Sequence, residues 1–138
     1  MKNSFTVTIE FSYKGESFEL TADVDLDECM KKMHGIPPLH DLIAKRNGID
    51  SYSYQYEVLH AEYLQFSQVE GFAADFIHGG EFDSEGFAEQ WRQEQLGVIL
   101  AEIAQRVLGI ADLAAQPPLK RALMEAYRAG QSAPISLE

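Results

Sequence analysis

Two runs within the first 26 residues alternate between apolar and polar side chains. Every second residue from Phe5 to Tyr13 is apolar, and the alternation resumes from Phe18 to Leu26 after Lys14-Gly15-Glu16. A period of two puts alternate side chains on one face of a strand. Two such runs joined by a short glycine-containing segment are typical of a hairpin. The pattern therefore predicts an antiparallel β-hairpin with one apolar face.

Helical spacing replaces the alternation after Asp25. Asp25 has the chemistry of an N-cap, and Glu28 follows at the position of a capping box, so we expect a short helix to about Met33. A second short helix should run from Pro38 to the Asn47-Gly48 stop signal. Longer helices are expected over residues 84–108, with Gly97 as a point of kinking or breakage, and over 117–130.

The segment between the two helical regions favours strands. Tyr52, Tyr54, Tyr56 and Val58 alternate with polar residues and predict a third strand. A fourth is expected over about 61–68, although 52–68 could also form one long bulged strand, and a short helix should follow over 69–77. The fold class that we predict is α+β, with an N-terminal antiparallel β-hairpin and about four antiparallel strands in total. These strands pack against a mainly helical C-terminal half.

The length of 138 residues suits one domain, which we assign to residues 1–130. Residues 131–138 are expected to form a flexible tail, whose final Leu137-Glu138 would be a remnant of the expression vector. Cys29 is the single cysteine and lies on the apolar stripe of its helix, so we expect a buried, unreactive thiol. With no signal peptide or membrane-spanning run recognised, we expect a bacterial-type cytoplasmic protein.

Negative charge and aromatic residues are concentrated in the middle of the chain. The net charge is −11, and residues 51–90 contain eight Asp or Glu but no Lys or Arg. The same 40 residues hold nine of the 15 aromatic side chains. Such acidity disfavours nucleic acid and anionic membranes as partners. The segment is either a core strand pair with a solvated acidic face or a surface for a basic partner.

The leading hypothesis is a small acidic, non-catalytic protein-interaction module that binds a basic protein. Aromatic side chains would supply the desolvated contacts, and carboxylates would steer the partner. The three alternating tyrosines could instead face the core, with their hydroxyls remaining wet. The candidate partner-binding residues are Tyr52, Tyr54, Tyr56, Glu57, Glu62, Asp75, Glu81 and Asp83.

The alternative is a small enzyme or metal-binding protein that uses His60 and His78 with nearby carboxylates. The candidate metal ligands are His60, His78, Glu81 and Asp83. Glu57-x-x-His60 has a ligand spacing used on helices, but on a strand the two side chains would point to opposite faces. We favour a non-enzymatic function and assign no catalytic residue and no cofactor. A further hypothesis is a homodimer formed through the helices in residues 84–130.

Overall fold

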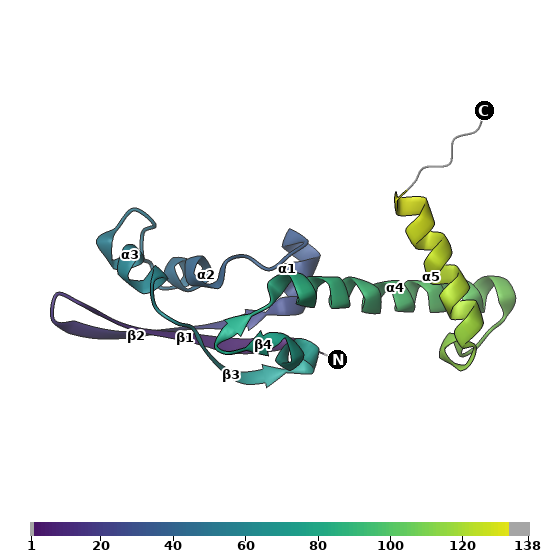
Figure 1. The fold of residues 1–138 in the computed structure, drawn as a ribbon, viewed down its shortest axis with the longest axis horizontal. Helices are drawn as coiled ribbons and strands as arrows, with labels where there is room; N and C mark the ends of the chain where they lie inside the picture. Colours follow the sequence, from purple (N-terminus) through teal and green to yellow (C-terminus); the bar gives the residue numbers. More distant parts are fainter. Residues whose placement is uncertain (1, 133–138) are drawn as a thin grey trace, which may run out of the picture. The chain divides into compact units, whose positions relative to one another are not determined.

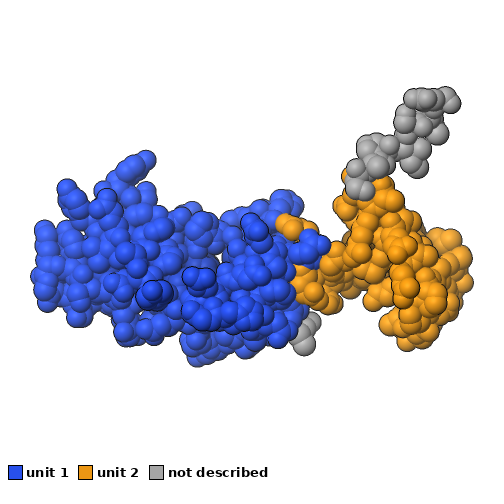
Figure 2. All heavy atoms as spheres, in the orientation of Figure 1, with its two compact units in different colours: residues 1–89 blue, residues 90–138 orange. Residues whose placement is uncertain are grey.

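The computed structural model describes residues 2–132 and divides the chain into two compact units. Unit 1 comprises residues 1–89 and unit 2 comprises residues 90–138 (Figure 2). This division into compact units does not test the prediction that residues 1–130 form one domain, which stays a prediction. The predicted tail falls mostly on residues 133–138, which lie outside the described residues, whereas 131 and 132 belong to a helix.

The predicted hairpin forms the centre of unit 1. Strand β1 (Ser4–Tyr13) pairs antiparallel with β2 (Glu16–Asp25) from Ser4↔Asp25 to Tyr13↔Glu16. Lys14 and Gly15 connect the two strands, with positive φ angles of 53° and 79°. Two-residue hairpin turns whose twist matches that of the strands require such angles. The alternation buries Phe5, Val7, Ile9 and Phe11 on one face.

Two further pairings complete the β-structure of unit 1. Strand β3 (Gln65–Glu70) lies on the other side of β1, so the sheet order is β2-β1-β3. A separate two-stranded ribbon consists of β4 (Ile77–His78) and β5 (Glu81–Phe82). The strand predicted over about 61–68 corresponds to β3, which begins later, at Gln65. The predicted helix over 69–77 is replaced by a 3₁₀ helix, η1 (Gly71–Phe76), followed by β4.

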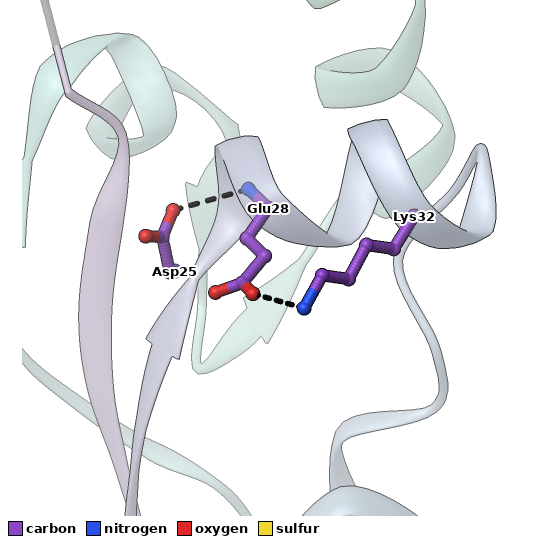
Figure 3. A network of polar contacts seen from close by, with 3 residues as sticks. All are labelled: Asp25, Glu28 and Lys32. Carbon is purple, nitrogen blue, oxygen red and sulfur yellow. Dashed lines mark hydrogen bonds and ion pairs between the residues drawn. The ribbon is translucent and has the colours of Figure 1, made fainter.

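Three short helices pack on the hairpin: α1 (Leu26–Met33), α2 (Leu39–Arg46) and α3 (Tyr54–His60) (Figure 1). The first two confirm the predictions made from capping and spacing. At the start of α1, the Asp25 side chain accepts a hydrogen bond from the Glu28 backbone N–H at 3.1 Å. Glu28 also pairs with Lys32 one turn later (Figure 3). The cap and the i,i+4 pair both stabilise this short helix.

Helix α3 corrects the predicted third strand. The Ser53 hydroxyl accepts a hydrogen bond from the Tyr56 N–H at 3.2 Å and caps the helix. Just before it, the Asp50 carboxylate accepts a hydrogen bond from the Tyr52 N–H at 2.9 Å. These local side-chain bonds compete with a sheet ladder and favour a turn followed by a helix. Burial of Leu59 against the rest of unit 1 holds the helix in place.

The core of unit 1 is built around phenylalanine rings. Phe5 makes edge-to-face contacts with Phe66 and Phe82, at centroid distances of 5.1 and 5.0 Å. Phe87, which is fully buried, stacks with Phe72 at 5.1 Å and also contacts Phe82. Such aromatic pairs contribute beyond their buried area. All five phenylalanines of residues 51–90 belong to this cluster: Phe66, Phe72, Phe76, Phe82 and Phe87.

Unit 2 is helical. Helix α4 (Ser84–Leu108) starts in unit 1 and runs unbroken through Gly97, where a kink or break had been expected. A short 3₁₀ helix, η2 (Leu113–Ala115), leads into α5 (Pro117–Ser132). With these helices, the predicted α+β class, with its N-terminal hairpin and helical C-terminal half, is confirmed. No helix in the described part of the chain is both long and apolar enough to span a bilayer.

Candidate functional site

The tyrosines of residues 51–90 lie on and beside α3, away from the phenylalanine core. Tyr52 is 96% exposed, Tyr54 73% and Tyr63 81%, which are unusually high values for rings of this size. Glu57 and Glu62 are exposed on the same stretch of chain. Tyr54 and Glu57 are three residues apart in the helix, so they share one of its faces. We call Tyr52, Tyr54, Glu57, Glu62 and Tyr63 the α3 surface.

The side of α3 that carries Tyr56 and His60 faces α2. Tyr56 and His60 are one helical turn apart and lie together, with 5.5 Å between their ring centroids. His60 also contacts His40 of α2 at a centroid distance of 5.1 Å, and the Tyr56 hydroxyl donates a hydrogen bond to the Asp41 carboxylate. These contacts from two helices fix the orientation of α3 and thereby hold its outer face toward solvent.

His40 anchors the chain that follows α3. Its Nε2 lies 2.7 Å from the backbone carbonyl oxygen of Glu62. Because a carbonyl oxygen only accepts, the imidazole must carry its proton on Nε2 and donate it. This bond holds the backbone between α3 and β3, where Glu62 and Tyr63 expose their side chains.

The Tyr56 hydroxyl has a charged hydrogen-bond partner, the Asp41 carboxylate. The hydrogen bond to Asp41 raises the pKa of the Tyr56 hydroxyl above its ordinary value, and partial desolvation and the negative charge of Asp41 act in the same direction. The phenol therefore stays protonated at neutral pH and acts as a donor that positions α3. It is neither a base nor a nucleophile in this arrangement.

Three of the predicted partner-binding acids lie on other elements. Asp75 is exposed on η1, and Glu81 is exposed on β5, where it pairs in register with His78. Asp83 accepts a hydrogen bond from the Gly86 N–H at 2.9 Å at the start of α4. In Figure 1, β4 lies closer to the N-terminus, whereas α3 lies toward the hairpin turn. The predicted set is therefore divided between the α3 surface and the β4–β5 region.

The four predicted metal ligands do not come together. His60 lies in α3 beside His40 and Tyr56, whereas His78, Glu81 and Asp83 lie in the β4–β5 ribbon and at the start of α4. Within residues 2–132, no three His, Cys, Asp or Glu side chains form a group that could hold a metal ion. Cys29 is buried, as predicted, and burial raises the pKa of its thiol, partly offset by the charge of Arg46.

Three residues of this region had not been identified from the sequence: His40, Asp41 and Tyr63. His40 and Asp41 were missed because their partners lie on α3, which had been assigned as a strand. The signal that could have revealed them is Ser53, a good N-cap that precedes Tyr56 and His60 at helical spacing. Tyr63 carries no such signal, because its exposure depends on how the chain leaves α3.

No protein-family model matches this chain, and neither a curated protein nor a solved structure resembles it significantly.

Proposed function

We propose that this protein is a non-catalytic interaction module whose α3 surface binds a basic segment of another protein. The observation that carries the proposal is the pairing of three highly exposed tyrosines with unpaired carboxylates. Tyrosine is enriched at interfaces because its ring gives apolar contact area while its hydroxyl still finds a hydrogen bond. Within the described residues, the Glu57 and Glu62 carboxylates form no ion pair, so a cationic partner meets free acceptors.

Charge across unit 1 supports a basic partner. Residues 1–89 contain 17 Asp or Glu and six Lys or Arg, a net charge of −11. No Lys or Arg occurs between Arg46 and Arg92, and the Arg46 guanidinium donates to the Asp23 carbonyl oxygen. Asp75, Glu81 and Asp83 add to this field from other elements without belonging to the contact surface. Such a field raises the rate of association with a cation more than the final affinity.

The kind of protein that best fits is an inhibitor or immunity-type protein for a basic enzyme, such as a nuclease. This assignment is an analogy of charge, because complementary potentials are what allow such pairs to associate quickly. This function would place the protein in a bacterial cytoplasm, and a single buried thiol suits such a reducing compartment.

Affinity capture from a bacterial lysate with matched charge variants tests the proposal. The variant Glu57→Lys/Glu62→Lys changes the α3 surface, and Glu16→Lys/Glu19→Lys makes the same change in charge on strand β2. We expect the wild type and the β2 variant to retain the same basic protein, and the α3 variant to lose it. The rate at which the wild type associates with this basic protein should fall steeply as the salt concentration rises.

Equal retention by all three proteins, or a captured protein whose association ignores salt, would contradict the proposal. Recovering no protein at low salt would contradict it as well. The variant Tyr52→Ser/Tyr54→Ser separates the two contributions, because it removes ring contacts and leaves the charge unchanged. We expect it to raise the dissociation rate while changing the association rate little.

A further inference from the structure

Helix α4 has one row of apolar side chains that its own unit covers. Leu96, Leu100 and Ala104 are buried and form a small core with Leu113. The half-buried Leu119, Leu123 and Met124 of α5 pack against this core. The spacing of four residues between the α4 positions places them on one side of the helix. This side accounts for the contact with α5.

A second apolar row on α4 is left open to solvent. Ile99, Ile103 and Val107 are also four residues apart, and they are 52%, 37% and 67% exposed. We call these three residues the α4 flank. Glu102 and Arg106 lie beside it, again four residues apart. Together with Gln105 they contribute to a hollow of about 740 Å³ that Ile99 and Ile103 also line.

The distribution of charge favours a second copy of the chain as the occupant. Residues 90–138 contain five Asp or Glu and five Lys or Arg, so unit 2 is neutral, whereas unit 1 carries the whole net charge of −11. Two copies repel each other through unit 1, and unit 2 offers a neutral surface on which this repulsion is absent. Homodimer interfaces also typically bury apolar side chains in surroundings that carry little charge.

We propose that the α4 flank pairs with the α4 flank of a second copy, with the two helices antiparallel about a two-fold axis at Ile103. An interface of this kind is self-complementary, so each contact occurs twice. Ile103 then meets its own counterpart, and Ile99 lies opposite Val107 of the second copy.

The charged residues beside the flank fit the same arrangement. In an antiparallel pair related by a two-fold axis, the same side of each helix meets. Glu102 and Arg106 lie on the same side, because they are four residues apart. With the axis at Ile103, Glu102 and Arg106 of the second copy are separated by only about 3 Å along the helix axis. By the same geometry the two Glu102 side chains are about 3 Å apart along the axis, and each is flanked by the Arg106 of the second copy. The interface therefore contains two pairs of opposite charge around one central pair of like charge. A parallel arrangement would not bring Glu102 and Arg106 of different copies to the same side.

The molar mass of the full chain tests this pairing. Sedimentation equilibrium from about 1 to 500 μM should show the mass rising from 15.5 kDa toward twice that value. Ile103→Lys places two like charges at the axis and should weaken dimerisation by about 100-fold or more. Leu108→Lys is the matched control, because Leu108 is 57% exposed and lies about 140° around the helix from Ile103 and about 160° from Arg106.

The result expected is a monomeric Ile103→Lys variant and a Leu108→Lys variant that dimerises like the wild type. A wild-type mass that stays at 15.5 kDa, or equal effects of the two substitutions, would overturn the proposal. Circular dichroism of both variants checks that the helices remain folded. The Glu57→Lys/Glu62→Lys variant should dimerise like the wild type in sedimentation equilibrium. A failure of the dimer proposal can therefore be distinguished from a failure of the partner-binding proposal.

Reversal of the charges provides a second measurement that does not depend on apolar packing. Glu102→Arg alone brings two arginines together at each end of the contact and should weaken dimerisation about tenfold, since the change acts twice. Arg106→Glu alone should do the same. The double variant restores opposite charges across the interface and should recover most of the wild-type affinity. A double variant that dimerises no better than either single variant would overturn the antiparallel register.

Discussion

Unit 1 and unit 2 bury their apolar side chains in different ways. In unit 1, a three-stranded sheet, three short helices and a ring cluster centred on Phe5 and Phe87 pack together. In unit 2, α4 and η2 supply a small core of four buried residues against which α5 packs, and α4 keeps a second apolar row exposed. Among residues 2–132, the exposed Val, Ile and Leu side chains lie in the neutral unit, whereas the acidic unit exposes tyrosine rings and Met33. The acidic unit is closed around its own core, and the neutral unit is not.

The largest expected effect is on the ring cluster of unit 1. Phe87 is fully buried and contacts Phe72, Phe76 and Phe82. Phe87→Ala removes these contacts and leaves a cavity, so the free energy of unfolding should fall by about 3–5 kcal/mol. Chemical denaturation followed by circular dichroism measures the change. A loss below about 1 kcal/mol would mean that unit 1 lacks the closed core described above.

A smaller and more local effect is expected in unit 2. Leu100 is 7% exposed and packs in a core with few partners. Leu100→Ala should cost about 2–3 kcal/mol, at the lower end for a buried leucine, because neighbouring side chains can collapse into the space. Hydrogen exchange should accelerate in residues 90–131 more than in β1 and β2. Equal acceleration in both regions would show that the two units unfold as one.

Asn3 tests how unit 1 ties its first strand to the elements around it. It is a buried polar residue, only 2% exposed, whose side-chain oxygen accepts a hydrogen bond from the Phe72 N–H at 2.9 Å. Its amide donates to the Asp27 carboxylate at 3.2 Å. Asn3→Ala leaves the Phe72 N–H without this acceptor, so a loss of about 2 kcal/mol is expected.

The control for Asn3 is Ser12→Ala at the exposed end of the same strand, which should change the free energy of unfolding by less than about 0.5 kcal/mol. Thermal or chemical unfolding of the two variants side by side gives the comparison. Similar losses in both would contradict a special role for the buried amide.

The smallest effect concerns the contact between α2 and α3. The pKa of Tyr56 is raised above its ordinary value of 10.0, chiefly because its hydroxyl donates to Asp41. A raised pKa means that the folded state binds the proton more tightly than the unfolded state. The stabilisation is therefore complete below the unfolded pKa and is lost as the pH rises through the folded one.

Tyr56→Phe removes both the hydrogen bond and this dependence on pH. We expect the wild type to be the more stable protein at neutral pH, and its advantage to shrink above a pH of about 10. Tyr54→Phe is the control, since Tyr54 is exposed and has no such partner. Unfolding measured across this pH range gives the comparison, and a constant difference between wild type and Tyr56→Phe would contradict the assignment.

Local signals were sufficient for much of the fold. The alternation of β1 and β2 required only that one face be buried, and the Lys14-Gly15 turn fixed their register. Asp25 marked the start of α1 because its carboxylate can accept from a backbone N–H three residues away. Helices α4 and α5 followed from apolar spacing. In each case, residues close in sequence make the interactions that decide the element.

The α3 region was misread because two local tendencies conflict there. Alternating tyrosines favour a strand, but that preference depends on packing against a neighbouring strand. The hydrogen bonds of Asp50 and Ser53 act within the segment itself and favour a turn and a helix. Because α2 then supplies Asp41 and His40 as partners, the helix is retained and the site acquires residues that alternation could not identify.

By itself, the sequence determined the hairpin, the principal helices, and an acidic segment that is rich in aromatic residues. Only the tertiary structure decided how these aromatics divide, with the five phenylalanines in a core around Phe5 and most of the tyrosines exposed on and beside α3. The physical reason is that a phenyl ring can be buried at no polar cost, whereas each buried phenol needs a hydrogen-bond partner. Tyr56, which is half-buried, donates its hydroxyl hydrogen bond to Asp41. Tyr52, Tyr54 and Tyr63 remain in solvent, where a partner can reach them.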